Sequence, residues 1–167
     1  MTKQKAKNPY LNKILAGTGA AVLACATVGS ILTKPDSPTY KTLKTPTWQP
    51  PAAVFPVAWT ALYTDIAVVN SRVLTDLVAE ERTKEARSLA TALGINLALN
   101  AGWSGVFFRT RRLWLAAAWA AVLAGSSWDL VRRATESSPA RGSALAPYGL
   151  WTTFATALST RIAQLNR

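Results

Sequence analysis

The chain has 167 residues and a net charge of +11, yet only 16% of its residues are charged and none is histidine. An ordinary soluble domain carries about 25% charged residues. Without histidine, the sequence excludes histidine-based acid–base catalysis, histidine zinc sites and histidine-ligated haem. The single cysteine, Cys25, cannot form an intramolecular disulfide and is expected to pack within a helix.

The charged residues avoid five apolar windows, residues 14–32, 52–71, 88–108, 113–128 and 142–160. These windows contain one charged side chain, Asp65, and each approaches the ~20 apolar residues that cross a bilayer core. The helices of a soluble bundle would instead present a charged face to water. We therefore predict an all-α integral membrane bundle of five transmembrane helices in one domain, residues 14–167. The predicted spans are residues 14–32, 52–71, 88–108, 113–131 and 142–162.

The positive charge also raises nucleic-acid binding as a possibility. The basic residues, however, form short flanks to the apolar windows, as in the tail over residues 1–13 and at Arg109, Arg111 and Arg112. This distribution is typical of anchoring at a membrane surface, so the expected partner is a lipid bilayer and not nucleic acid. Five spans place the termini on opposite sides, but the basic residues on the two sides are too similar in number to orient the chain.

The first predicted span is rich in small residues and follows the basic tail. Residues 33–51 then contain five prolines, which predict an ordered, non-helical cap. The connection over residues 72–87 has mixed charge and is expected to extend its flanking helices into water. The connection after the third span is very short and predicts antiparallel neighbours. Before the fifth span, Ser137, Ser138 and Pro139 form a possible helix cap.

In the second span, Phe55, Trp59 and Tyr63 recur every four residues and share one face. Asp65 lies off this face, and it is either a partner for another helix or a ligand-binding group. In the fifth span, Trp151 and Phe154 lie on one face with Pro147 and Leu158. Aromatic side chains within spans, away from the interfaces, suggest a pocket for a flat apolar molecule.

The third span has two different faces. One carries two amides and two aromatics, at Asn96, Asn100, Trp103 and Phe107. A buried amide is costly unless it has a partner, so Asn100 predicts either a helix–helix hydrogen bond or a ligand-facing amide. The opposite face has a stripe of small residues, which predicts a homodimer contact. The stripe is Ala90, Gly94, Ala98 and Gly102.

Three blocks of residues resemble the TspO/MBR family of translocator proteins and tryptophan-rich sensory proteins. Residues 46–63, PTWQPPAAVFPVAWTALY, resemble its P-x-W-x-P-P…F-x-x-x-W-x-x-L-Y block, and residues 96–108, NLALNAGWSGVFF, resemble its Q-L-A-L-N-x-x-W…F-F block. Residues 146–166 resemble its P-Y-x-x-W…F-A ending. The resemblance covers about residues 40–166, in the family's order.

The resemblance implies five transmembrane helices around a pocket, with the loop after the first helix folded over it as a lid. The family's ligands include protoporphyrin IX, haem, cholesterol and benzodiazepine-type drugs. Matching motif positions, together with Phe55 from the aromatic face, give the expected ligand-binding residues. They are Tyr40, Trp48, Phe55, Trp59, Tyr63, Asn100, Trp103, Phe107, Tyr148 and Trp151.

The sequence departs from the family pattern at several positions. Asn96 replaces the glutamine before L-A-L-N, and Trp119 stands where many relatives carry an acid. The sterol-recognition pattern of animal members requires a tyrosine where this chain has Thr160. Sterol binding through that pattern is therefore doubtful, whereas the internal pocket residues are retained.

Three functions follow as hypotheses. The first is a membrane protein that binds porphyrin or haem as a ligand, regulating or transporting it, with no required cofactor, no metal site and no catalytic residues. The second is an enzyme that degrades porphyrin in light, for which the resemblance implicates Trp59, Trp151 and Asn100. The third is a sterol transporter or interaction protein. The expected location is the mitochondrial outer membrane in a eukaryote, which the basic N-terminal extension favours, or a cell-envelope membrane in a bacterium.

Overall fold

A computed structural model describes residues 9–167, which form five long helices and one short one. The predicted basic tail lies largely outside the described residues. The short helix, α2, occupies the connection after the first long helix. The helices are α1 (Leu11–Leu32), α2 (Pro38–Lys41), α3 (Val54–Ala79), α4 (Thr83–Arg109), α5 (Leu113–Ser137) and α6 (Pro139–Leu165).

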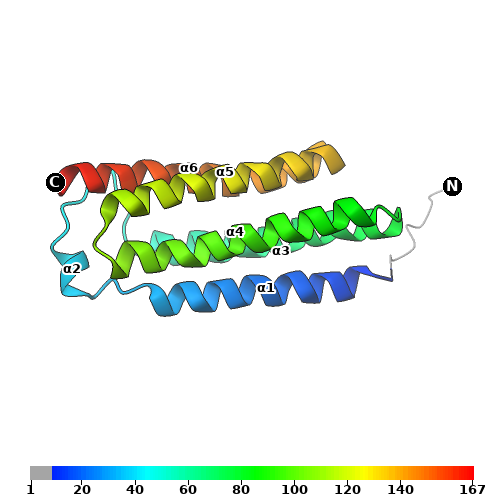
Figure 1. The fold of residues 1–167 in the computed structure, drawn as a ribbon, viewed down its shortest axis with the longest axis horizontal. Coiled ribbons are helices and arrows are strands. Elements are labelled where there is room, and N and C mark those ends of the chain that lie inside the picture. Colours follow the sequence, from blue (N-terminus) through cyan, green and yellow to red (C-terminus); the bar gives the residue numbers. More distant parts are fainter. Residues whose placement is uncertain (1–8) are drawn as a thin grey trace.

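The five long helices lie side by side along one axis, and α1 begins at the end of the bundle opposite to the one where α6 ends (Figure 1). Helix α1 packs against α3 and α4, α4 packs against α5, and α5 and α6 make the most extensive contact. Helix α3 contacts α6 and closes the ring. The all-helical, five-helix prediction is confirmed.

The helices extend past the predicted spans where the sequence becomes polar. Helix α3 continues to Ala79 and α4 begins at Thr83, so the charged connection is mostly helical, as expected. Large apolar side chains cover the outside of the bundle, with Leu23 68%, Val57 72% and Leu150 61% exposed. Such exposure suits lipid better than water. By length and hydropathy alone, α1 and α5 pass a strict test for crossing a membrane.

The segment between α1 and α3, residues 33–53, covers one end of the bundle, and we call it the lid (Figure 1). The prediction that this segment is non-helical is wrong over Pro38–Lys41, which form one helical turn. Asn166 holds the lid to α6, because its Oδ1 accepts from the Lys44 N–H and its Nδ2 donates to the Lys44 carbonyl, both at 2.9 Å. The Trp48 ring also contacts the Phe154 ring at 5.9 Å.

Helices α5 and α6 form a tight hairpin. Pro139 is at the start of α6, as predicted, but Ser138 caps the helix without a side-chain hydrogen bond. A Cβ added at Gly142 would lie 2.9 Å from the Thr135 Cα, and one at Gly149 would lie 2.9 Å from the Trp128 ring. Glycine is therefore required at both positions for the helices to approach this closely.

The small-residue stripe of α4 divides into two parts. Ala90, Gly94 and Ala98 are exposed on the outside of the bundle. Gly102 is half-buried, and a Cβ there would lie 2.8 Å from the ring of Trp119 on α5. The Trp119 Nε1 donates to the Leu99 carbonyl at 2.7 Å, which fixes the ring beside Gly102. Gly102 therefore serves a contact within the chain.

Candidate functional site

Seven aromatic residues from the lid, α3 and α6 form what we call the inner aromatic group. Trp59 lies at its centre, with ring centroids 5.2 Å from Tyr63, 6.5 Å from Tyr148 and 6.4 Å from Trp151. Trp151 also contacts Phe55 at 5.9 Å. The four-residue spacing on α3 places these rings on one face, toward α6. The group is Trp48, Phe55, Trp59, Tyr63, Tyr148, Trp151 and Phe154.

Four further aromatic residues form a lid-end aromatic group. Trp103 and Phe107 on α4 are stacked, with centroids 5.0 Å apart and planes at 22°. Tyr40 of the lid reaches Phe107 at 6.1 Å and Phe108 at 5.1 Å. The two aromatic groups meet, because Phe55 and Phe154 pack against the same buried apolar cluster as Trp103 and Tyr40. The structure thus brings together the aromatic residues that the sequence analysis singled out, although in two groups.

A chain of hydrogen bonds crosses the bundle behind the inner aromatic group. The Tyr63 hydroxyl donates to Asn100 Oδ1 at 3.0 Å, and Asn100 Nδ2 donates to the Tyr148 hydroxyl at 3.2 Å. The Tyr148 hydroxyl in turn donates to Asn96 Oδ1 at 2.7 Å. Asn96 Nδ2 then donates to Ser127 Oγ on α5 at 3.2 Å. This polar chain links α3, α4, α5 and α6, and each side chain in it has a hydrogen-bond partner on a neighbouring helix.

The polar chain bears on the two interpretations of Asn100. Asn100 is 4% exposed and both ends of its amide are bonded to tyrosines, so it makes the interhelical hydrogen bonds of the simpler interpretation. Tyr148 and Asn96 are fully buried at 0% exposure. Trp59, Tyr63 and Trp151 are half-buried. Trp59, Tyr63 and Trp151 are therefore more accessible to a ligand than Asn100 and Tyr148.

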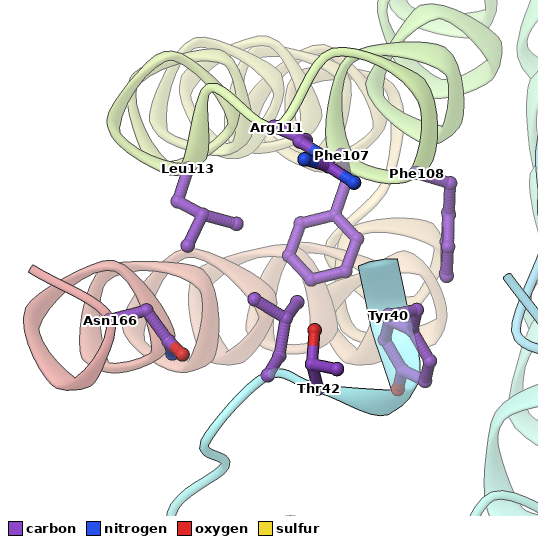
Figure 2. A pocket seen from close by; sticks show the side chains of 8 residues that line it. Tyr40, Thr42, Phe107, Phe108, Arg111, Leu113 and Asn166 are labelled. Atoms are coloured by element: carbon purple, nitrogen blue, oxygen red, sulfur yellow. The ribbon is translucent and has the colours of Figure 1, made fainter. Parts of the chain in front are cut away.

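A pocket of about 270 Å³ lies under the lid, and we call it the lid-end pocket. Figure 2 shows Phe107 and Arg111 at the α4–α5 corner facing Tyr40 and Thr42 of the lid. Asn166 and Leu113 complete the sides. Of the predicted site residues, Tyr40 and Phe107 line it, whereas Trp59 and Trp151 lie in the inner aromatic group. Its lining residues are Tyr40, Thr42, Leu43, Phe107, Phe108, Arg111, Leu113 and Asn166.

Two residues left open by the sequence have different surroundings. Cys25 is buried, and its thiol donates to the Leu97 carbonyl at 3.2 Å, consistent with helix packing. Asp65 is half-buried on α3, and no hydrogen bond or ion pair joins it to other residues within the described range 9–167. Among the described residues it is therefore not a partner for another helix.

Several residues that line or support the site were not predicted from the sequence. Arg111 was interpreted as a membrane-surface anchor, and nothing in its spacing distinguishes it from Arg109 or Arg112. Phe108 and Asn166 were noted as parts of family blocks without a role at the site. The serines that receive the Asn96 amide, Ser126 and Ser127, have no signal beyond being polar in an apolar span.

Comparisons with known proteins agree with this arrangement. The profile of the TspO/MBR family matches residues 18–165. The chain is 35% identical over 151 residues to a tryptophan-rich sensory protein of Cereibacter sphaeroides, covering 88% of this chain and 87% of that protein. It is 32% identical over 150 residues to the tryptophan-rich protein TspO of Chlorobaculum tepidum, covering 86% and 90%. An uncharacterized membrane protein, YtaB, of Bacillus subtilis is 31% identical over 131 residues, covering 78% and 82%. The chain therefore belongs to the TspO/MBR family, and its five long helices form an integral membrane bundle.

Proposed function

We propose that the protein binds a tetrapyrrole, protoporphyrin IX or haem, in the aromatic interior between α3, α4 and α6, and that it regulates or transports this ligand. The observation that carries the proposal is the convergence of three half-buried rings from two helices, Trp59, Tyr63 and Trp151. The Trp59 ring centroid lies 5.2 Å from that of Tyr63 and 6.4 Å from that of Trp151. Large flat rings bury much apolar area and stack favourably on one another. Membership of the TspO/MBR family, whose ligands include protoporphyrin IX and haem, supports the same ligand class.

In this proposal the aromatic rings exchange partners when the ligand enters. Each aromatic pair contributes about 0.5–1.5 kcal/mol beyond the area it buries, and a stacked porphyrin replaces these contacts with its own. Tyr63 is the half-buried member of these rings whose hydroxyl also belongs to the polar chain, because it donates to Asn100 Oδ1. The polar chain behind it holds α4 and α6 in register during the exchange.

Equilibrium titration with protoporphyrin IX tests the proposal. We expect folded protein in detergent to shift the porphyrin absorbance band saturably, with a midpoint at micromolar ligand. Unsaturable uptake, equal to that of empty micelles, would exclude a tetrapyrrole site. The same titration with cholesterol as competitor tests the third hypothesis, because displacement of porphyrin would assign the interior to a sterol.

Illumination of the bound complex separates binding from degradation. If the protein only binds, the porphyrin absorbance in light decays at the rate seen in empty micelles. Faster decay that Trp59→Phe and Trp151→Phe both abolish would assign the protein to the degrading enzymes. Trp114→Phe is the matched control, since Trp114 is 49% exposed and lies outside the inner aromatic group.

For the location, the relatives named above are bacterial and support a cell-envelope membrane over the mitochondrial outer membrane.

Self-association belongs to the same proposal. Ala90, Gly94 and Ala98 form an exposed small-residue surface on α4, which allows the close backbone approach of a second copy. Gly102 is not part of this surface because Trp119 covers it.

Larger side chains on this surface should separate the dimer. We expect Gly94→Leu combined with Ala98→Leu to halve the protein mass measured by light scattering in detergent. Ala118→Leu is the control, since Ala118 is also exposed but lies on α5. An unchanged mass in the double variant would exclude this surface as the interface.

A further inference from the structure

The lid-end pocket has an apolar wall and a basic rim. Phe107, Phe108 and Leu113 supply aromatic and aliphatic surface, while Arg111 lies beside Phe107 at the α4–α5 corner (Figure 2). Across the pocket are the lid residues Tyr40 and Thr42. An apolar wall next to a guanidinium suits the end of a molecule that is flat and apolar but carries an acid.

The three arginines of the α4–α5 corner have different positions. Arg109 caps α1, its guanidinium donating to the Ile31 carbonyl at 3.1 Å. Arg111 and Arg112 are both exposed, but Arg112 does not line the pocket. Arg111 adopts φ 56°, a left-handed conformation that is unfavourable for a non-glycine residue. The turn thus places one arginine of the three on the pocket wall.

The charge of the lid end favours an anion. Basic residues surround this end, whereas Asp36 is its acidic residue within the described range 9–167 and already pairs with Lys41 at 3.4 Å. The acids of α3, α4 and α5 lie at the opposite end or within the bundle. An excess of one sign around a cleft raises the local concentration of the opposite ion. The basic residues are Lys34, Lys41, Lys44, Arg109, Arg111, Arg112, Arg161 and Arg167.

The pocket is suited to one edge of a large ligand. Its volume of about 270 Å³ falls below the ~300–1,000 Å³ of sites that enclose a whole drug-sized molecule. Phe107 connects the pocket to Trp103, whose Nε1 is buried without a hydrogen-bond partner in the described chain. An unpaired buried donor is costly, and an acceptor on an entering ligand would relieve it. The unpaired Trp103 donor therefore lies one ring away from the pocket, behind Phe107.

We propose that Arg111 binds the carboxylate edge of the tetrapyrrole in the lid-end pocket, so that the protein selects tetrapyrroles with free carboxylates. The inference rests on the function proposed above. A guanidinium pairs with a carboxylate through two parallel hydrogen bonds, which a neutral ester cannot reproduce. Arg111 is thereby a specificity-determining residue.

The test compares protoporphyrin IX with its dimethyl ester, which has the same ring and no free acid. Both are titrated against wild type, Arg111→Gln and Arg112→Gln in one detergent, with empty micelles as the blank. Loss of a charge-assisted hydrogen bond predicts roughly tenfold or greater weakening of acid binding in Arg111→Gln. Ester binding should change less than twofold. Arg112→Gln removes the same charge from a residue that does not line the pocket, so it should weaken acid binding much less than Arg111→Gln. Arg111→Lys, which keeps the charge without the planar fork, should lie between wild type and Arg111→Gln.

The possible outcomes distinguish the inference from the function on which it rests. If the wild type binds acid and ester alike and Arg111→Gln changes neither, the inference is overturned and tetrapyrrole binding stands. If Arg111→Gln weakens both ligands equally, Arg111 has a structural role only, which also overturns the inference. If the wild type binds neither ligand saturably, the proposed function is wrong, and the inference that rests on it is overturned as well. Circular dichroism of each variant verifies that the helices remain folded before the titration.

Discussion

Gly142→Ala is expected to destabilise the protein more than any other single-methyl change at a glycine. The added Cβ would overlap the Thr135 Oγ1 and lie 2.9 Å from the Thr135 Cα. The hydroxyl can rotate away, but the backbone of α5 can move only if the hairpin opens. Overpacking of this kind costs about 1–3 kcal/mol or more, which corresponds to roughly 2–12 °C in the thermal midpoint for a chain of this size.

Gly125→Ala is the matched control for Gly142→Ala. Gly125 lies within α5, and a Cβ there would meet nothing within 4 Å. Because alanine favours a helix interior over glycine by about 0.5–1 kcal/mol, this variant should be neutral or more stable. The thermal midpoints are measured side by side in one detergent. Equal midpoints for the two variants would mean that α5 and α6 do not approach as closely as described.

Tyr148→Phe is expected to give the second large loss of stability. Its hydroxyl accepts from Asn100 and donates to Asn96, so its removal leaves a donor and an acceptor unpaired in a fully buried position. Unpaired buried groups cost about 1–3 kcal/mol, and interhelical hydrogen bonds in membranes are worth up to ~1.7 kcal/mol. We expect a loss of about 1–2 kcal/mol, measured as a lower midpoint in detergent.

A second substitution tests the origin of that loss. Replacing both partners of a hydrogen bond by apolar groups can be nearly neutral, so Asn96→Leu should cost less in the Tyr148→Phe background than in wild type. Tyr40→Phe is the control, because the contacts of Tyr40 given above are made by its ring. Simple additivity of the two substitutions would contradict a hydrogen bond between Asn96 and Tyr148.

The helices were predictable because the sequence separates charge from apolar residues so completely. A window such as residues 88–108 has no charge, and its periodicity correctly separated the face of Asn96 and Asn100 from the face of Gly94. The five prolines of residues 33–51 predicted a segment without helix, yet a short helix forms at Pro38–Lys41. Proline opposes the interior of a helix but is compatible with its first turn, where Pro38 lies.

The internal contacts of the site were less predictable than the identity of its residues. Periodicity assigned Asn100 to an inward face but not to partners, since Tyr63 and Tyr148 come from other helices whose rotation the sequence does not specify. The role of Arg111 in the pocket was not predictable for a related reason. Its place on the pocket wall depends on a left-handed backbone conformation at Arg111. Such a conformation is usually indicated in a sequence by glycine or asparagine, and neither stands at this position.

The central claim is that a tetrapyrrole lies against the aromatic interior, and quenching of tryptophan fluorescence by protoporphyrin IX tests it most directly. Wild type is compared in detergent with a variant carrying Asn100→Ala and Trp151→Phe, and with Trp114→Phe as control. We predict saturable quenching at micromolar ligand in wild type and control, and a markedly weaker apparent affinity in the double variant. Equal affinities in folded wild type and double variant, or quenching that never saturates, would contradict the claim.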